Sequence, residues 1–295
     1  MKVDREERPI NRPPRASLLP FIIAAVVIAA IALWFVFKPG PQPVDEPVAI
    51  TEQPVTPTLP QEQDDPLINQ APDIPERTPE VTDGSEDAAP ELPDLSASDN
   101  FTREQLVPLS ESEELAQWLG TDDLLPKAAA VIDGLARGVL VKKVLPMEPP
   151  GKEFKVSMEQ DMAWMDESNY TRYNRYVSVL TSIPPEALAS TFHTLRPLLE
   201  KAYGDLGGNA GSIDNRVIAA IDRMLLTPDH NGPFALERES VHYQFVDPTL
   251  EALPGIQKQL LRIGPDNRAK LKNYLRELRV ALLAESPGAD NEQTP

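Results

Sequence analysis

The stretch SIDNRVIAAIDRML, residues 212–225, repeats its apolar side chains at the three- and four-residue spacing of an α-helix. Those side chains would form one buried stripe, with the charged residues Asp214, Asp222 and Arg223 on the opposite side. The stripe comprises Val217, Ala220, Ile221, Met224 and Leu225. Such a stripe needs apolar faces of other elements to cover it, so the stretch predicts a helix in the core of a helical domain.

Similar spacing recurs on both sides of this stretch. Ser98 is expected to cap the first of these helices, Ser110 or Ser112 the second, and Gly138 to end the third. The further predicted helices lie in residues 98–106, 110–120, 121–138, 168–180, 184–207, 255–264 and 265–285.

Two stretches alternate apolar and polar residues instead, as half-buried strands do. In KEFKVSMEQDMAWMD, residues 152–166, Phe154 and Val156 alternate with charged residues. In PFALERESVHYQFVD, residues 233–247, Tyr243 and Phe245 alternate with polar ones. Each stretch predicts a short β-hairpin.

The expected fold class is therefore mainly α, with one soluble helical domain over residues 94–285 that contains about two short β-hairpins. Residues 286–295 are expected to form a disordered tail. A single domain of this length is of ordinary size.

Residues 18–37 are twenty consecutive residues without a charge. A helix of that length is about 30 Å long, which matches the hydrocarbon core of a bilayer. No small-residue cleavage site follows Phe37, so these residues predict a transmembrane helix that remains as an uncleaved signal anchor.

The orientation of this single span follows from the charges beside it. The tail over residues 1–17 is basic, whereas Lys38 is the lone base just after the span. By the positive-inside rule the tail is cytoplasmic and the rest of the chain is exported, which in a Gram-negative cell means an inner-membrane protein with a periplasmic domain. The bases of the tail are Lys2, Arg5, Arg8, Arg12 and Arg15.

Residues 38–93 are rich in proline, aspartate and glutamate, with 13 prolines and no hydrophobic period. A segment of this composition cannot bury enough apolar surface to offset the entropy of ordering it, so it is expected to be a disordered linker. It would span about 40 Å as a coil and roughly 170 Å as polyproline II.

Composition also excludes several classes of function. The formal net charge of −18 argues against nucleic acid as a partner, because phosphates attract basic surfaces. The chain has no cysteine, which rules out disulfides, thiolate zinc sites and thiol catalysis.

Five stretches together resemble a Gram-negative family of domains of unknown function that accompany an N-terminal membrane anchor. The similarity covers about residues 92–283. The resemblance implies an architecture and a bacterial origin, and it implies no activity or catalytic residue. The five stretches are LPDLSASDNF (92–101), DGLARGVLVKKVLP (133–146), RYNRYV (172–177), LRPLLEKAYGDLG (195–207) and ESVHYQFVDPTLEALPGIQKQLLRIGPDNRAKLKNYLREL (239–278).

Positive charge gathers around the first predicted hairpin of this acidic chain. Such a basic patch could receive an anionic polymer, lipid headgroups or an acidic partner, or it could be an ordinary solvated surface. Its members are Arg137, Lys142, Lys143, Lys152 and Lys155.

A second candidate surface is the helix around residues 170–176. Tyr170, Tyr173 and Tyr176 recur on one side of it, with Arg172 and Arg175 between them. Tyrosine rings stack on sugars and arginine binds carboxylates, so the helix could bind a cell-wall glycan, whereas rings at this spacing are also typical of a core.

No metal, cofactor or catalytic motif is predicted. The histidines His193, His230 and His242 lack the spacing of metal ligands, and neither a nucleophile elbow nor a phosphate-binding loop occurs. Neighbouring acids such as Asp122 with Asp123 do not by themselves identify a general acid and base.

The leading hypothesis is a membrane-anchored periplasmic binding or scaffolding protein that acts through contacts with an envelope protein or cell-wall glycan, not as an enzyme. The alternatives are a cell-wall-active, carboxylate-dependent glycan hydrolase and a passive structural spacer.

Overall fold

The computed structural model describes residues 65–76, 92–145, 147–151, 153–239 and 242–284. The chain divides into two units, residues 1–57 and 58–295, and all described residues belong to the second. The predicted basic tail, the span over 18–37, most of the linker and the C-terminal tail lie outside the described residues. Within the described ranges, no helix is both long and apolar enough to cross a membrane.

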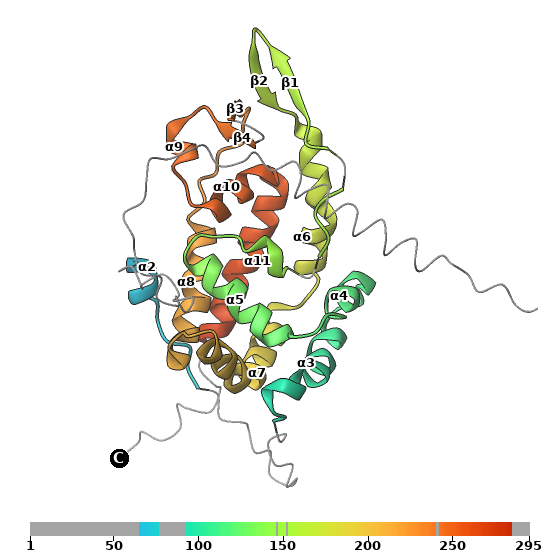
Figure 1. The fold of residues 1–295 in the computed structure, drawn as a ribbon, viewed down its shortest axis with the longest axis vertical. Coiled ribbons are helices and arrows are strands. Elements are labelled where there is room, and N and C mark those ends of the chain that lie inside the picture. The colour runs from blue at the N-terminus through green and yellow to red at the C-terminus, as the bar shows by residue number, and fades with distance from the viewer. Residues whose placement is uncertain (1–64, 77–91, 146, 152, 240–241, 285–295) are drawn as a thin grey trace, which may run out of the picture. The chain divides into compact units, whose positions relative to one another are not determined.

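The described residues form a mainly helical domain with one small antiparallel sheet, as predicted (Figure 1). Short 3-10 helices connect several of the α-helices. The α-helices are α2 (Pro66–Asn69), α3 (Ser98–Leu106), α4 (Glu113–Trp118), α5 (Leu124–Ala136), α6 (Asn174–Leu180), α7 (Pro185–Asp205), α8 (Ile213–Leu225), α9 (Pro248–Glu251), α10 (Gly255–Arg262) and α11 (Pro265–Leu283). The 3-10 helices are η1 (Leu95–Ala97), η2 (Val107–Leu109), η3 (Lys142–Val144), η4 (Glu167–Tyr173) and η5 (Ala210–Ser212).

Helix α8 is at the centre of the helical part, in contact with α2, α5, α7, α10 and α11. Ala220 and Ile221 of its predicted apolar stripe are buried. The predicted solvent-facing side is wrong, because Asp214 and Arg223 are also buried. Other elements cover the side of α8 that carries Asp214 and Arg223 and supply their ionic partners. The charge of these two residues therefore did not mean that they face water.

The four strands form one sheet in the order β1-β2-β3-β4, and all neighbours are antiparallel. The two predicted hairpins are confirmed, and a pairing between Ala163 and Leu236 joins them. Helices α9 and α10 cover the sheet through a cluster that includes Leu250 and Leu261, while the β1-β2 hairpin extends away from the helices (Figure 1). The strands are β1 (Val156–Glu159), β2 (Met162–Met165), β3 (Ala235–Glu239) and β4 (His242–Phe245).

The predicted helix ends are partly confirmed. Gly138 follows α5 with a φ of 81°, a conformation that favours glycine. Ser112 occupies the N-cap position of α4, but its hydroxyl donates to the Glu114 carboxylate and makes no capping hydrogen bond. The prediction for Ser98 is wrong, since Ala97 occupies the N-cap position of α3. The Ser98 hydroxyl instead donates to the carbonyl of Leu95 at 2.7 Å, which ties α3 to the preceding 3-10 turn.

The predicted linker also needs correction in one part. Residues 65–76 contain a helical turn, α2, and two buried isoleucines, and they lie beside α8 (Figure 1). The two isoleucines of this part pack on an apolar surface of the domain, and composition alone could not predict that contact. The linker prediction for residues 38–64 and 77–91 falls outside the described residues.

Candidate functional site

Residues 65–76, which we call the tether segment, dock on the helical domain. The Asp65 side chain accepts a hydrogen bond from the backbone of Leu67 at 3.0 Å and so caps α2. Pro66 occupies the first helical position, where a missing N–H is tolerated. Pro72 and Pro75 disfavour a continuation of the helix after α2, and the second half of the segment has no regular secondary structure.

The first apolar contact of the tether segment is Ile68, whose exposed fraction is 6%. It packs in one cluster with Ala136 of α5 and with Ala219 and Ala220 of α8. Alanine side chains leave space between the two helices, and the isoleucine occupies it.

The second apolar contact is Ile74, whose exposed fraction is 2%. It shares a cluster with Ile218 and Ile221 of α8 and with Leu275 and Leu282 of α11. We call the surface that α5, α7, α8 and α11 form around Ile68 and Ile74 the α8 groove.

Arg223 provides the charge at one end of the α8 groove. Its guanidinium forms an ion pair with Asp65, and its Nε donates to the carbonyl of Ala136 at 2.6 Å. Gln257 donates to the backbone carbonyl of Arg223 at 2.8 Å. The guanidinium is thus held in place by α5, so the domain presents it to the carboxylate in a fixed position.

Asn215 and Arg196 bind the backbone of the segment's second half. The Asn215 amide donates to the carbonyl of Ala71 at 2.7 Å and to the Asp73 carboxylate at 3.2 Å. Arg196 donates to the carbonyl of Ile74 at 3.2 Å. Hydrogen bonds to backbone groups can hold a chain whatever its side chains, so only the isoleucines and the acids of the segment make contacts that depend on its sequence.

Asp214 lies under this end of the groove. Its carboxylate is 2.5 Å from the Arg196 guanidinium and also interacts with the backbone of Ile74. Burial raises the pKa of Asp214 to about 6, although Arg196 acts in the opposite direction. We call Asp65, Arg223, Asp214 and Arg196 the segment cluster, because their contacts join the tether segment to the domain.

A second buried ionic group, the Asp133 cluster, lies within the helical body. Asp133 of α5 pairs with Arg137, accepts from the Tyr203 hydroxyl at 3.1 Å and lies 3.6 Å from the Arg216 guanidinium. Burial, followed by the charge of Asp133, raises the pKa of Tyr203. The cluster fixes α5 against α7 and α8, so its geometry indicates a structural role.

The sequence profile of a family described as a protein of unknown function, DUF3014, matches residues 124–279, which is more than half of the chain. The chain belongs to the DUF3014 family. No curated protein and no solved structure matches it. The predicted resemblance to an uncharacterised domain family is thereby confirmed.

The DUF3014 match includes all of α5, α7 and α8 and most of α11. Most of the walls of the α8 groove, with Arg196, Asn215 and Arg223, therefore belong to the matched region, while Leu282 lies just beyond it. The tether segment, residues 65–76, lies outside the matched range.

The predicted basic patch is partly neutralised. Arg137 pairs with Asp133, whereas Lys142 and Lys143 in η3 and Lys155 before β1 are exposed. Lys152 lies outside the described residues. The structure thus leaves exposed cations at η3 and at the foot of the hairpin, and their role in binding stays a prediction.

The tyrosine rings of the other predicted surface pack in the core, which is the alternative that the sequence had left open. Tyr170 lies against Gly264, where an added Cβ would be 2.4 Å from the ring. Tyr173 belongs to two core clusters, and Tyr176 stacks on Trp118 with ring centroids 6.0 Å apart. These rings do not form an open platform for sugars.

The arginines between these tyrosines also have partners. Arg172 donates to the carbonyls of Pro150 and Gly151, each at 3.2 Å. Arg175 lies over the Tyr176 ring, 4.9 Å from its centroid. Arg172 therefore fixes the loop before β1, and Arg175 is the more exposed of the two.

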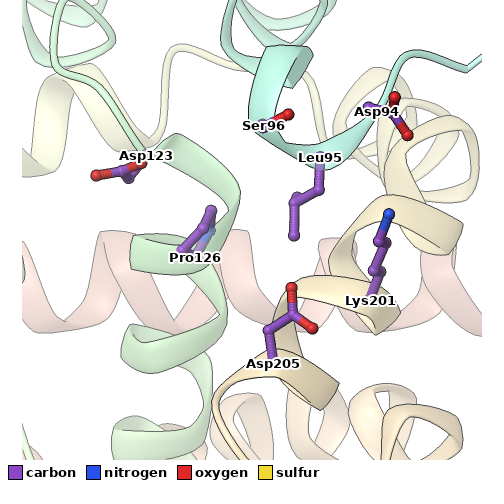
Figure 2. A pocket seen from close by; sticks show the side chains of 7 residues that line it. All are labelled: Asp94, Leu95, Ser96, Asp123, Pro126, Lys201 and Asp205. Atoms are coloured by element: carbon purple, nitrogen blue, oxygen red, sulfur yellow. The ribbon is translucent and has the colours of Figure 1, made fainter.

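A shallow hollow of about 340 Å³ lies between η1, the start of α5 and the end of α7 (Figure 2). Asp94, Asp123 and Asp205 are exposed aspartates in its lining. Figure 2 shows the Asp205 carboxylate directed into the hollow and the Asp123 carboxylate directed away from it. A glycosidase needs two carboxylates that flank the scissile bond, and the Asp123 carboxylate does not face that of Asp205. No group of acids and histidines in the described ranges is arranged to hold a metal ion.

Sequence reasoning missed the α8 groove and its occupant. The available signal was DPLINQAPDIPE, residues 65–76, where an aspartate and a proline mark a helix start and two isoleucines interrupt the acidic composition.

Proposed function

We propose that this DUF3014 protein is a single-pass inner-membrane protein whose helical domain lies in the periplasm and acts as a binding or scaffolding module. Residues 18–37 would be its anchor, and the five bases of residues 1–17 favour a cytoplasmic N-terminus. An envelope protein is the proposed class of partner.

The observation that best supports a binding role is the docked tether segment. The domain holds a linear stretch of chain through two buried isoleucines, the Arg223–Asp65 ion pair and backbone hydrogen bonds from Asn215 and Arg196. Apolar anchors combined with backbone hydrogen bonds are the usual means by which domains recognise peptides.

Docking would also set the distance between the anchor and the domain. Between the predicted span and Asp65 there are 27 residues, 38–64. As a coil these would span roughly 30 Å, and as polyproline II roughly 80 Å. With the tether segment docked, a partner would therefore have to lie closer to the membrane than it could if all of residues 38–93 were free.

The glycan hydrolase is the second candidate. The Asp205 side chain points into the hollow of Figure 2 and would supply one of its two carboxylates, and the second would have to come from outside that lining. Release of soluble fragments from purified cell wall by the full chain, and loss of that release in Asp205→Asn, would establish it in place of scaffolding.

Two experiments on the full chain in living Gram-negative cells test the leading proposal. The first compares reporter fusions at the two ends of the chain, and we expect an export-dependent reporter to be active only after residue 295. Activity at the N-terminus instead would contradict the topology.

The second experiment places photo-crosslinking residues at Lys143, Lys155 and Gln70, all of which are exposed. Exposed Lys270 of α11 is the matched control position. A recurrent protein adduct at one of the three positions that is absent at Lys270 is the expected result. Equal, scattered adducts at all four positions would contradict a scaffolding role, and an unchanged cell after replacement of the domain by an unrelated one would favour the passive spacer.

A further inference from the structure

The α8 groove is a surface that requires an occupant. Ile68 and Ile74 cover Ala219, Ala220 and Ile218, which are among the most buried residues of the domain. Without a covering chain, this apolar surface and the guanidinium of Arg223 would face water along one side of the central helix. Apolar surface of this kind on a soluble domain marks a site of interaction.

The present occupant is bound in the manner of a peptide ligand. The contacts described above come from the twelve consecutive residues 65–76. Its only helix, α2, has four residues, which is far too short to be stable without the domain. The segment therefore owes its conformation to the groove and would lose it on release.

The contacts define what the groove recognises, when positions are counted from the acid at Asp65. The acid binds Arg223, an isoleucine three positions later fills the alanine-lined site, and an isoleucine nine positions later fills the site between α8 and α11. Between the two isoleucines, the Asn215 amide donates to the carbonyl of Ala71, six positions after Asp65, and to the carboxylate of Asp73, eight positions after it. The charge complementarity lies at Asp65, which pairs with Arg223 of the groove. Arg196 is already paired with Asp214 and Glu200 and binds the occupant through a backbone carbonyl.

We propose that the α8 groove recognises an acidic peptide of a partner protein, with an acid, an aliphatic residue three positions later and another nine positions later, and that the tether segment is its internal competitor. This inference rests on the proposed role as a binding protein. The DUF3014 match includes most of the walls of the groove, whereas the tether segment, like α3 and α4, precedes it. Binding of the partner peptide in place of the tether segment would free residues 65–76. Partner binding would thereby increase the distance that the domain can move from the predicted anchor.

The test uses the purified full chain in detergent micelles and a fluorescent synthetic peptide of residues 64–77. In the double variant Ile68→Asp/Ile74→Asp the segment is released while every wall of the groove keeps its native residues. A linked competitor acts at a high effective concentration, so its release should tighten peptide binding at least tenfold, measured by fluorescence anisotropy.

The matched control is Asn69→Asp/Gln70→Asp, which adds the same charge to the same segment at two exposed positions. It should bind the peptide as weakly as the wild-type chain does. A peptide in which both isoleucines are aspartate should not bind any of the chains.

The proposal would be overturned if the released chain, with the circular dichroism of the wild type, showed no saturable binding. Equal affinity for the two peptides would overturn it as well. If the double variant fails to fold, Asp65→Lys reverses the contact with Arg223 at a half-exposed residue and should tighten binding about threefold, and no change there would be equally decisive.

Two further measurements identify the occupant. Selection of displayed random peptides on the released full chain should enrich the acid and aliphatic spacing given above, and enrichment of basic or unpatterned sequences would contradict the assignment.

A crosslinking test distinguishes binding of the segment within one chain from binding between two copies. Because the chain has no cysteine, the single variants Ala71→Cys and Asn215→Cys can be mixed and treated with a short thiol crosslinker. We expect crosslinks within a chain that carries both substitutions and no covalent dimers between single variants. Abundant dimers would show that a second copy is the occupant and would overturn the partner assignment.

Failure of these binding tests would leave the topology and the cross-links at Lys143 and Lys155 unaffected, so the proposed function and this inference fail separately.

Discussion

The Asp133 cluster and the segment cluster are both built on aspartate–arginine pairs, and they differ in what they join. The Asp133 cluster connects α5, α7 and α8, all of which are regular helices of the body. The segment cluster connects α7 and α8 to twelve residues that have no fold of their own. The Asp133 cluster can open only if the body unfolds. In the segment cluster, the Arg223–Asp65 ion pair and the hydrogen bond from Arg196 to Ile74 can open when the tether segment leaves, whereas the Asp214–Arg196 pair lies between α7 and α8 and would remain.

This difference predicts different costs for opening the two clusters. A buried ion pair inside a rigid body contributes to a unique packing, and removal of one partner leaves an uncompensated charge in the core. An ion pair between a body and a short segment opens at a smaller cost, which a competing peptide would have to offset in the exchange that we propose.

The largest effect is expected in the Asp133 cluster. Asp133→Ala leaves buried Arg216 without this carboxylate and removes the acceptor of the Tyr203 hydroxyl. The free energy of unfolding should fall by about 3–5 kcal/mol, measured by urea denaturation of the full chain. Asp122→Ala, whose side chain is 94% exposed, is the control and should change it by less than about 0.5 kcal/mol. Similar losses in Asp133→Ala and Asp122→Ala would contradict the structural role of the Asp133 cluster.

A pH-dependent effect is expected at Asp214 in the segment cluster. Its folded-state pKa of about 6 lies above its ordinary value of 3.8, so the folded chain binds the proton more tightly than the unfolded chain. The resulting stability is fully present below about pH 4 and is lost as pH rises through about 6. The unfolding free energy of the wild type relative to Asp214→Asn should therefore fall by at most about 3 kcal/mol between pH 4 and pH 7. A difference that does not change with pH would contradict the burial of this carboxylate.

A smaller loss is expected from Ile74→Ala than from its neighbour in the body, Ile218→Ala. Both side chains are almost fully buried in the same cluster. Truncation of Ile218 should cost about 2–5 kcal/mol. Truncation of Ile74 should cost only about 1–2 kcal/mol, because the loss cannot exceed the free energy of docking the segment. Equal losses would mean that the tether segment is an integral part of the core.

The smallest effect is expected from Asp65→Ala, which removes a half-exposed ion pair and the cap of α2. The unfolding free energy should fall by about 1 kcal/mol. Hydrogen exchange should accelerate in residues 66–74 and stay unchanged in α8. Faster exchange throughout α8 would contradict a local contact.

The sequence predicted the parts of the fold whose signal is local. The apolar spacing in α5, α8 and α11 and the alternation around Val156 and Phe245 identified the helices and both hairpins. The pairing of Ala163 with Leu236 escaped prediction, because it joins residues far apart in the chain and leaves no local pattern.

The candidate site escaped prediction for a similar reason. Ile68 and Ile74 are isolated in an acidic, proline-rich stretch, so they gain their role only from the apolar surface of α8. The charge of Arg223 suggested a solvated side, although its partners come from α5 and from Asp65. Periodicity reports which residues share a face and gives no information about what a distant segment brings to that face.

The most direct test of docking is hydrogen exchange at individual backbone amides of the full chain. The amides of Asn69 and Gln70 donate to Asp65 and Pro66 at 3.0 Å, in a helix too short to be stable alone. We expect these amides to exchange more slowly than in the free peptide of residues 64–77, and the protection to vanish in Ile68→Asp/Ile74→Asp while α8 stays protected. Exchange at free-peptide rates in the wild-type chain, with α8 protected, would contradict the docking of the tether segment.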